Sequence, residues 1–389
     1  MKRMIRRAAC VALAVLSLGL GSAVAAGEAV DLKPFVANYA SLVHASYADT
    51  EARARQLQTA VAAFLAAPSE GTLAQARSAW LDARVAYGQT ECFRFYGGPI
   101  DGVDAAGVEG PETRLNAWPL NEAHIDYVAG DAAAGLVQKA DLPLSRESLM
   151  ANNMTHDEAD VATGFHAVEF LLWGQDPGLD GAGQRPASDF AAGDAVRGRR
   201  RLYLQLTTAM IVDDLAAMTQ AWSPDVADNY RAEFLGLDPA VATGHILSGL
   251  ATLCGFEMAA ERMATALDSG DPEDEQSCFS DNTHNDFIYN ALGVRNVCVG
   301  SYGAQSGVGL LAVLQQADPA LAGKLAAQLD ATDRLVAGIP VPFDAVLASP
   351  EDSVERAKVQ AVVEALMVQT DLLRDVGKAL GVTVIVAAE

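Results

Sequence analysis

The sequence predicts an all-α protein built from two helical-bundle-like halves. The 389-residue chain is rich in Ala, Leu, Gln, Glu and Arg, which are favourable helix formers. Few segments alternate apolar and polar residues in the manner of a half-buried strand. Apolar residues recur at helical spacing between Val359 and Leu380, which indicates a helix facing a core. A chain of this length exceeds what one hydrophobic core usually serves, so we expect two domains.

Residues 1–26 are predicted to form a secretory signal peptide. Four basic residues precede the apolar segment Ala8–Leu20, and the small residues Ala23 and Ala25 provide a cleavage site near Ala25 or Ala26. No later apolar run approaches the roughly 18 residues needed to span a bilayer. We therefore expect an exported, periplasmic protein without a transmembrane segment, either free or peripheral to the outer membrane.

The N-terminal half, residues 27–225, is expected to contain three long helices and one shorter helix. Thr155 and Glu158 have the spacing of a capping box at the start of the shorter helix, and Gly174 is a plausible stop for it. Thr72 is expected to cap the second long helix. The long helices are predicted over residues 32–66, 73–95 and 191–222.

The C-terminal half, residues 226–389, is expected to be a second helical bundle. Thr283–Asp286 followed by Gly293–Cys298 repeats, at nearly the same offset, the pattern of Thr155–Glu158 followed by Gly164–Glu169. This similarity suggests that the two halves are related by an internal duplication. The helices of this half are predicted over residues 239–267, 284–316, 319–336 and 350–380.

The charge of the chain restricts the partners that it can bind. It has 27 basic and 50 acidic residues, and the predicted cleavage removes four basic and no acidic ones, leaving 23 against 50, a net charge of −27. A surface this acidic argues against nucleic acid and anionic lipid as partners. It suits the capture of a cation and also simple solubility.

Four cysteines remain after cleavage: Cys92, Cys254, Cys278 and Cys298. In an oxidising compartment an even number predicts up to two disulfides, and the spacing does not choose among the three possible pairings.

The strongest functional pattern is Gly164-Phe165-His166-Ala167-Val168-Glu169, a G-x-H-x-x-E motif in a strongly apolar segment. Residues three apart are neighbours on a helix, so His166 and Glu169 are expected to point the same way. A buried carboxylate needs a partner. That partner is either a metal ion held jointly with His166 or the imidazole itself through a hydrogen bond.

Arg84 and Glu91 belong to a second pattern, the ladder of large and charged residues from Trp80 to Glu91. The pattern is compatible with ordinary amphipathic packing. The functional alternative is a buried Arg–Glu pair that faces the G-x-H-x-x-E motif.

The polar segment Ser277–His284 supplies further candidates. Local turn and capping hydrogen bonds explain most of such a segment, although Asp281, Thr283 and His284 could also provide ligands. Arg295 occupies the position in the second repeat that corresponds to the histidine of the first.

The motif does not complete a known peptidase signature. Zinc peptidases carry H-E-x-x-H or H-x-x-E-H, and here Glu169 is followed by Phe170. A catalytic zinc needs three protein ligands and an open position. One histidine with several carboxylates is closer to a site for iron or manganese. No nucleophile elbow, P-loop or dinucleotide fingerprint is present.

Taken together, these segments resemble the imelysin family, also classed as M75 peptidase-like, which includes iron-regulated periplasmic proteins and an insulin-cleaving membrane protease. The resemblance implies an all-helical protein of two bundle-like halves, with the G-x-H-x-x-E residues near the interface of the halves. It also implies a metal site and a link to iron uptake or regulation. The segments that carry it are Trp80–Glu91, Gly98–Asp101, Pro111–Leu120, Gly164–Gly174 and Ser277–His284.

The first hypothesis is therefore a periplasmic protein of iron acquisition or regulation. His166 and Glu169 would ligate iron, Glu91 or Asp286 would complete the site, and iron-uptake or outer-membrane proteins would be the partners. The alternative is a zinc metallopeptidase of the insulin-cleaving kind that uses the same pair. A third hypothesis is a scaffold protein in which these polar residues only form hydrogen bonds.

Overall fold

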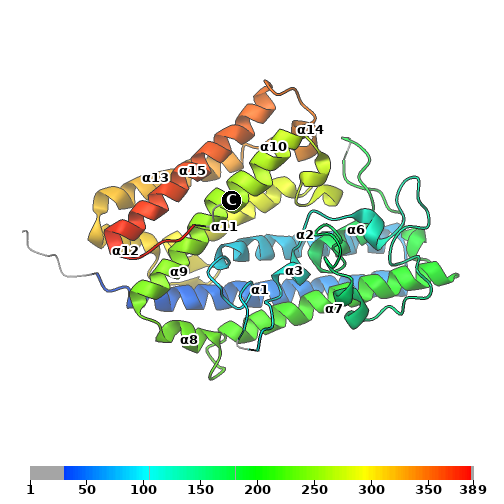
Figure 1. The fold of residues 1–389 in the computed structure, drawn as a ribbon, viewed down its shortest axis with the longest axis horizontal. Helices are drawn as coiled ribbons and strands as arrows, with labels where there is room; N and C mark the ends of the chain where they lie inside the picture. The colour runs from blue at the N-terminus through cyan, green and yellow to red at the C-terminus, as the bar shows by residue number, and fades with distance from the viewer. Residues whose placement is uncertain (1–29, 105, 180, 387–389) are drawn as a thin grey trace, which may run out of the picture.

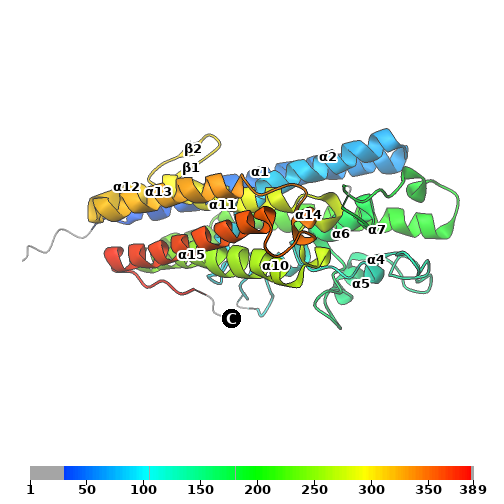
Figure 2. The ribbon, with the colours of Figure 1, turned by 90° about the horizontal axis from the view of Figure 1, so that it is seen from above.

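The computed structural model describes residues 30–104, 106–179 and 181–386. The predicted signal peptide lies outside these residues. The all-α prediction is confirmed, because helices dominate and the strands of the described residues are limited to one small hairpin (Figures 1 and 2). That hairpin pairs β1 (Ser301–Tyr302) with β2 (Gln305–Ser306).

Three long elements form the frame of the N-terminal half. Helix α1 (Lys33–Ala66) packs along both α2 (Glu70–Tyr87) and α7 (Ala195–Trp222), as Figure 1 shows. The short helix α6 (Gly164–Trp173) packs against α2 and α7. The remaining elements are short: the 3-10 turns η1 (Gly88–Phe93) and η2 (Ala187–Phe190), and helices α3 (Glu112–Leu115), α4 (Glu122–Ile125) and α5 (Arg146–Ala151).

The C-terminal half is built around α15 (Val354–Leu380), which packs against α9 (Pro239–Thr252), α13 (Pro319–Val336) and the π-helix η3 (Leu253–Ala264). Helix α11 (Thr283–Val299) contacts η1 and α2 as well as α13, so it joins the two halves. The other elements are α8 (Tyr230–Gly236), α10 (Thr265–Ser269), the 3-10 turns η4 (Pro272–Asp274) and η5 (Cys278–Ser280), α12 (Leu310–Ala317) and α14 (Phe343–Leu347).

Several predicted boundaries are wrong for local reasons. The predicted capping box at Thr155 does not start a helix, since the Thr155 hydroxyl donates to the Ala151 carbonyl at 2.8 Å and the helix begins at Gly164. Ser69 caps α2, and Thr72 is its capping-box partner. The predicted helix over 284–316 stops at Gly300, whose φ of 82° lies in the left-handed region, and the hairpin and α12 come after it.

The predicted duplication is not confirmed. Gly164 begins α6, whereas the matching Gly293 lies in the middle of α11. The predicted boundary after residue 225 falls in the connection between α7 and α8.

One helical run of the C-terminal half is more apolar than expected. Pro239–Ser269 is long and apolar enough to cross a membrane by length and composition, so the expectation that no later run approaches that length is wrong. However, 72% of its apolar window is buried inside the fold, as in the core helix of a folded domain. The absence of a membrane span stays a prediction.

The cysteines do not form the predicted disulfides. Cys92, Cys254, Cys278 and Cys298 are all free thiols. Burial raises the pKa of each of them, so they remain protonated at neutral pH.

Gly164 is required by the backbone at the start of α6. Its φ is 89°, and a Cβ atom would lie 2.6 Å from the Leu115 carbonyl oxygen. We expect Gly164→Ala to destabilise the protein by about 1–3 kcal/mol through strain at this left-handed position. Gly323→Ala is the matched control, because Gly323 lies within α13 with nothing within 4 Å of the added Cβ. It should stabilise the protein by about 0.5–1 kcal/mol. Urea denaturation of both variants measures the difference, and equal effects would contradict the assignment.

Candidate functional site

His166 and Glu169 face each other within a completely buried helix. Every residue of α6 is buried, and the two side chains are 1% and 0% exposed. His166 Nδ1 lies 2.8 Å from Glu169 Oε2, a hydrogen-bond distance. The i,i+3 spacing therefore brings the imidazole and the carboxyl together, as the helical pattern predicts.

The second oxygen of Glu169 binds a segment of the C-terminal half. Glu169 Oε1 accepts hydrogen bonds from the backbone N–H and the hydroxyl of Ser280, at 3.0 and 2.6 Å. Ser280 belongs to η5, just before α11. The carboxyl thus connects the two halves of the molecule.

Burial shifts this pair toward its neutral form. Burial is the main cause that lowers the pKa of His166, and Arg84 and Arg262 lower it further. Burial likewise raises the pKa of Glu169 to about 8, although the Ser280 hydrogen bonds oppose that change. His166 Nε2, the nitrogen that faces away from Glu169, is buried and has no hydrogen-bond partner. It is the one polar atom of the pair that remains free.

Arg84 forms a buried ion pair with Asp286 of α11. Its Nε and Nη2 donate to Asp286 Oδ1 at 3.1 and 2.8 Å, and its Nη1 donates to Asn116 Oδ1 at 2.5 Å. The other Asp286 oxygen accepts a hydrogen bond from the Ser277 hydroxyl. Both oxygens of Asp286 are therefore engaged.

The predicted pair between Arg84 and Glu91 does not form. The α-helix ends at Tyr87 and Glu91 lies in the 3-10 turn η1, so the two side chains do not share one helical face. Glu91 Oε2 instead accepts hydrogen bonds from Arg94 and Arg262, at 2.9 and 2.6 Å.

The environment of Glu91 favours its ionised form. Burial alone would raise its pKa, but the Arg94 and Arg262 guanidinium groups outweigh burial and lower the pKa to about 2. Glu91 Oε1 is buried without a hydrogen-bond partner.

The buried polar residues centred on His166, Arg84 and Glu91 form one network between the two halves. The remaining candidates lie partly in this network and partly elsewhere. The Thr283 hydroxyl accepts a hydrogen bond from the Ser277 backbone N–H, which makes it part of the local turn. His284 is half-buried, and its Nδ1 has no partner. Arg295 pairs with Asp330 and Asp333 of α13 on the outside of α11. It therefore belongs to the packing of α11 on α13.

Sequence reasoning missed several members of the network. Ser280 and Arg262 contact the predicted residues directly. Ser280 lies in the polar segment Ser277–His284 but was not among the residues selected from it, and Arg262 stands in no recognisable motif. Arg262 could have been found from its position in the apolar run Pro239–Ser269. An arginine buried in such a run must be paired with an acidic or polar partner. Asn116 lies in the Pro111–Leu120 segment that the family resemblance covers, but its type alone indicates no role.

Comparison with known proteins places this arrangement in a family. The family profile described as Imelysin (Peptidase_M75) matches residues 43–373. The chain belongs to the imelysin family. It is 28% identical over 331 residues to the iron-regulated protein A of Synechococcus elongatus, covering 82% of this chain and 79% of that protein.

Two solved structures have the same fold. One is a putative iron-regulated protein A precursor from Parabacteroides distasonis, with a TM-score of 0.65, 21% identity, and coverage of 90% of this chain and 95% of that one. The other is an imelysin-like protein from Psychrobacter arcticum, with a TM-score of 0.65, 17% identity, and coverage of 92% and 99%.

The Glu91 ion pairs give a stability prediction with a defined pH dependence. Glu91→Gln should cost up to about 3–5 kcal/mol at pH 7, because it removes the most deeply buried of the carboxylates that pair with Arg94 and Arg262 and leaves them only Glu112 and Glu257. A carboxyl whose pKa falls from 4.5 to about 2 on folding contributes stability that is lost as the pH falls through that window. The cost of the substitution should therefore shrink at pH 3.

Urea denaturation at pH 7 and pH 3 measures this cost, with the exposed Glu351→Gln as the matched control. An equal cost at both pH values would contradict the assigned role of Glu91.

Proposed function

We propose that this imelysin family member is an exported metal-binding protein of iron acquisition or regulation, with its site centred on His166 and Glu169. The observation that carries the proposal is the buried His166 Nε2, which has no hydrogen-bond partner while the ring's other nitrogen bonds a carboxyl. Metal-bound histidines usually have this arrangement, in which a carboxylate orients the ring and the opposite nitrogen binds the metal.

These contacts support a separate role for each residue in the proposed metal site. His166 would hold the ion through Nε2, and Glu169 would fix the ring and supply negative charge. Of the two completing candidates, Glu91 has a buried oxygen without a partner, whereas both oxygens of Asp286 are engaged. The metal would supply Lewis acidity or redox chemistry, according to its identity.

The charge balance of the surrounding network supports a cation. Three buried or nearly buried guanidinium groups pair with four carboxylates, which leaves one negative charge in excess. Ionisation of Glu169 would add a further negative charge, which a bound cation would offset. The groups are Arg84, Arg94 and Arg262 with Glu91, Glu112, Glu257 and Asp286.

Iron is favoured over zinc by the donor set and by the relatives. A single imidazole with carboxylate oxygens suits iron better than a catalytic zinc, which needs three protein ligands. In the described residues, the group of three His, Cys, Asp or Glu side chains whose ligand atoms lie within 4.8 Å of one another excludes His166, so either metal would need side-chain movement or water ligands to complete its coordination there. The name of the Synechococcus relative links that protein to regulation by iron.

Metal titration tests the proposal. Anaerobic calorimetric titration of the purified protein with Fe²⁺ should show one site, which His166→Ala abolishes. Glu169→Gln should weaken binding by about 10–100-fold, the usual effect of losing a group that orients a metal ligand. The exposed His156→Ala is the matched control and should bind as the wild type does.

Unchanged binding in His166→Ala would contradict the site. If the wild type instead cleaves peptides in a chelator-sensitive manner and His166→Ala does not, the zinc metallopeptidase becomes the correct function. Absence of binding for any metal by a folded protein would leave the scaffold hypothesis.

Affinity should also depend on pH. Below the Glu169 pKa of about 8, the buried imidazole and carboxyl together hold two protons. With a metal on Nε2, His166 keeps only the proton on Nδ1 and Glu169 must be ionised to accept it. Metal binding must expel the second proton, so affinity should rise by up to about tenfold per pH unit between pH 6 and 8. Glu169→Gln should flatten this dependence, and an equally steep dependence in that variant would contradict the coupling.

Export is tested separately by the mass of the processed chain. The protein recovered from a periplasmic extract should begin at Ala26 or Gly27. A full-length chain confined to the cytoplasm would contradict this part of the proposal without affecting the metal site.

A further inference from the structure

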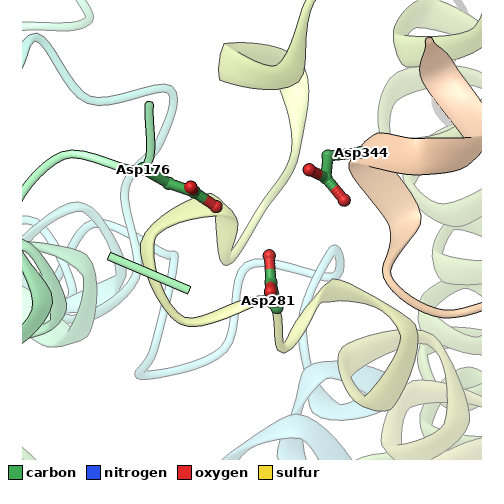
Figure 3. Close-up of side chains that lie close together, drawn as sticks. All are labelled: Asp176, Asp281 and Asp344. Carbon is green, nitrogen blue, oxygen red and sulfur yellow. The ribbon is translucent and has the colours of Figure 1, made fainter. Parts of the chain in front are cut away.

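Three aspartates converge at a second place, outside the network around His166. Asp176 lies in the loop after α6, Asp281 in the turn before α11, and Asp344 in α14. One carboxylate oxygen from each lies within 4.8 Å of the other two. Figure 3 shows the three side chains approaching one another from three separate segments.

A cavity of about 260 Å³ adjoins this cluster. Asp176 and Asp344 line it together with two glutamates, Glu273 and Glu275. No lysine, arginine or histidine is among its lining residues in the described part of the chain. Like charges gathered in this way are unfavourable unless protons or a cation neutralise them.

Glu275 provides an independent sign of a ligand. Its side chain lines the cavity, the residue is only 2% exposed, and its Oε1 has no hydrogen-bond partner. Burial, together with Asp344, Asp281 and Asp176, raises its pKa to about 9, although the Thr283 side chain opposes that change. A buried carboxyl oxygen without a donor is costly, and a bound cation is one means of removing that cost.

We propose that Asp176, Asp281 and Asp344 bind one hard divalent cation of the size of Ca²⁺, with Glu275 as the buried carboxylate beside it. Ca²⁺ lies about 2.3–2.6 Å from each ligand oxygen, so ligands of one ion are at most about 5 Å apart. The three aspartate oxygens satisfy this limit without rearrangement. An all-oxygen donor set also selects hard cations over zinc or copper.

The backbone holds the ligands in place. The Gly183 N–H donates to the Phe279 carbonyl at 2.9 Å, which ties the loop of Asp176 to the turn of Asp281. Asp281 adopts a left-handed conformation with φ of 55°, which Asp and Asn tolerate better than most residues. Because Asp176 belongs to the N-terminal half and the other two ligands to the C-terminal half, the ion would link the halves.

This site is distinct from the proposed iron site. The two proposed sites share no residue, although they meet at one turn. In that turn Ser280 binds Glu169, and its neighbour Asp281 belongs to the aspartate cluster. Calcium binding should therefore survive His166→Ala, so failure of one proposal does not decide the other.

Calcium titration of chelator-treated full-length protein tests the inference. Wild type should bind one Ca²⁺ with a Kd of about 10⁻⁵–10⁻³ M and unfold at a higher temperature in its presence. Asp281→Asn and Asp344→Asn should each weaken binding at least tenfold. Asp371→Asn, an exposed aspartate on α15, is the matched control and should bind normally.

A reversal of stability separates a cation site from a merely structural cluster. In chelator, Asp281→Asn should be at least as stable as wild type because one repelling charge is gone, whereas in calcium wild type should be the more stable. Absence of calcium binding at about 10 mM, or normal binding in both cluster variants, would overturn the proposal. So would a variant that is destabilised equally with and without calcium.

Discussion

The constraint on which the structure depends is the pairing of charges buried between its two halves. Arg84 and Asp286 are 202 residues apart in sequence and Glu91 and Arg262 are 171 apart, yet each pair lies almost fully inside the molecule. Because an unpaired buried charge is far more costly than a lost surface contact, Arg84 and Asp286 each depend on the opposite half for an ionic partner. The interface is thus fixed by ionic matching as well as by apolar packing.

The same burial determines the chemistry of α6. In water at neutral pH a glutamate is ionised and a histidine is partly protonated, but inside an apolar helix the neutral form of both is favoured. The hydrogen bonds from Ser280 only partly oppose this effect. A pair of this kind releases a proton when it binds a cation, so its binding is coupled to pH by the fold itself.

Much of the fold follows from local signals in the sequence. The bounds of α13 are those expected, because Pro319 occupies its first position and Asp318 caps it. The mutual orientation of His166 and Glu169 follows from helical spacing alone. These features need no knowledge of distant contacts.

Features set by tertiary contacts were not predictable. The spacing of Arg84 and Glu91 looks helical, but the change to a 3-10 turn after Tyr87 separates them. Asp176 and Asp344 lie in or beside loops without periodicity, so nothing in the chain indicates that they meet Asp281. The free state of the cysteines likewise depends on where three of them are buried, which composition does not reveal.

The π-helical segment Leu253–Ala264 has a consequence for how this protein tolerates insertions and deletions. Such wide turns are rare and usually contain an additional residue relative to a regular helix. Removing one residue near its start would rotate the remainder of the helix by about 100°, and Arg262 would turn away from Glu91. Surface loops can vary in length, but this helix must keep its number of residues so that the Arg262 guanidinium reaches the Glu91 carboxylate.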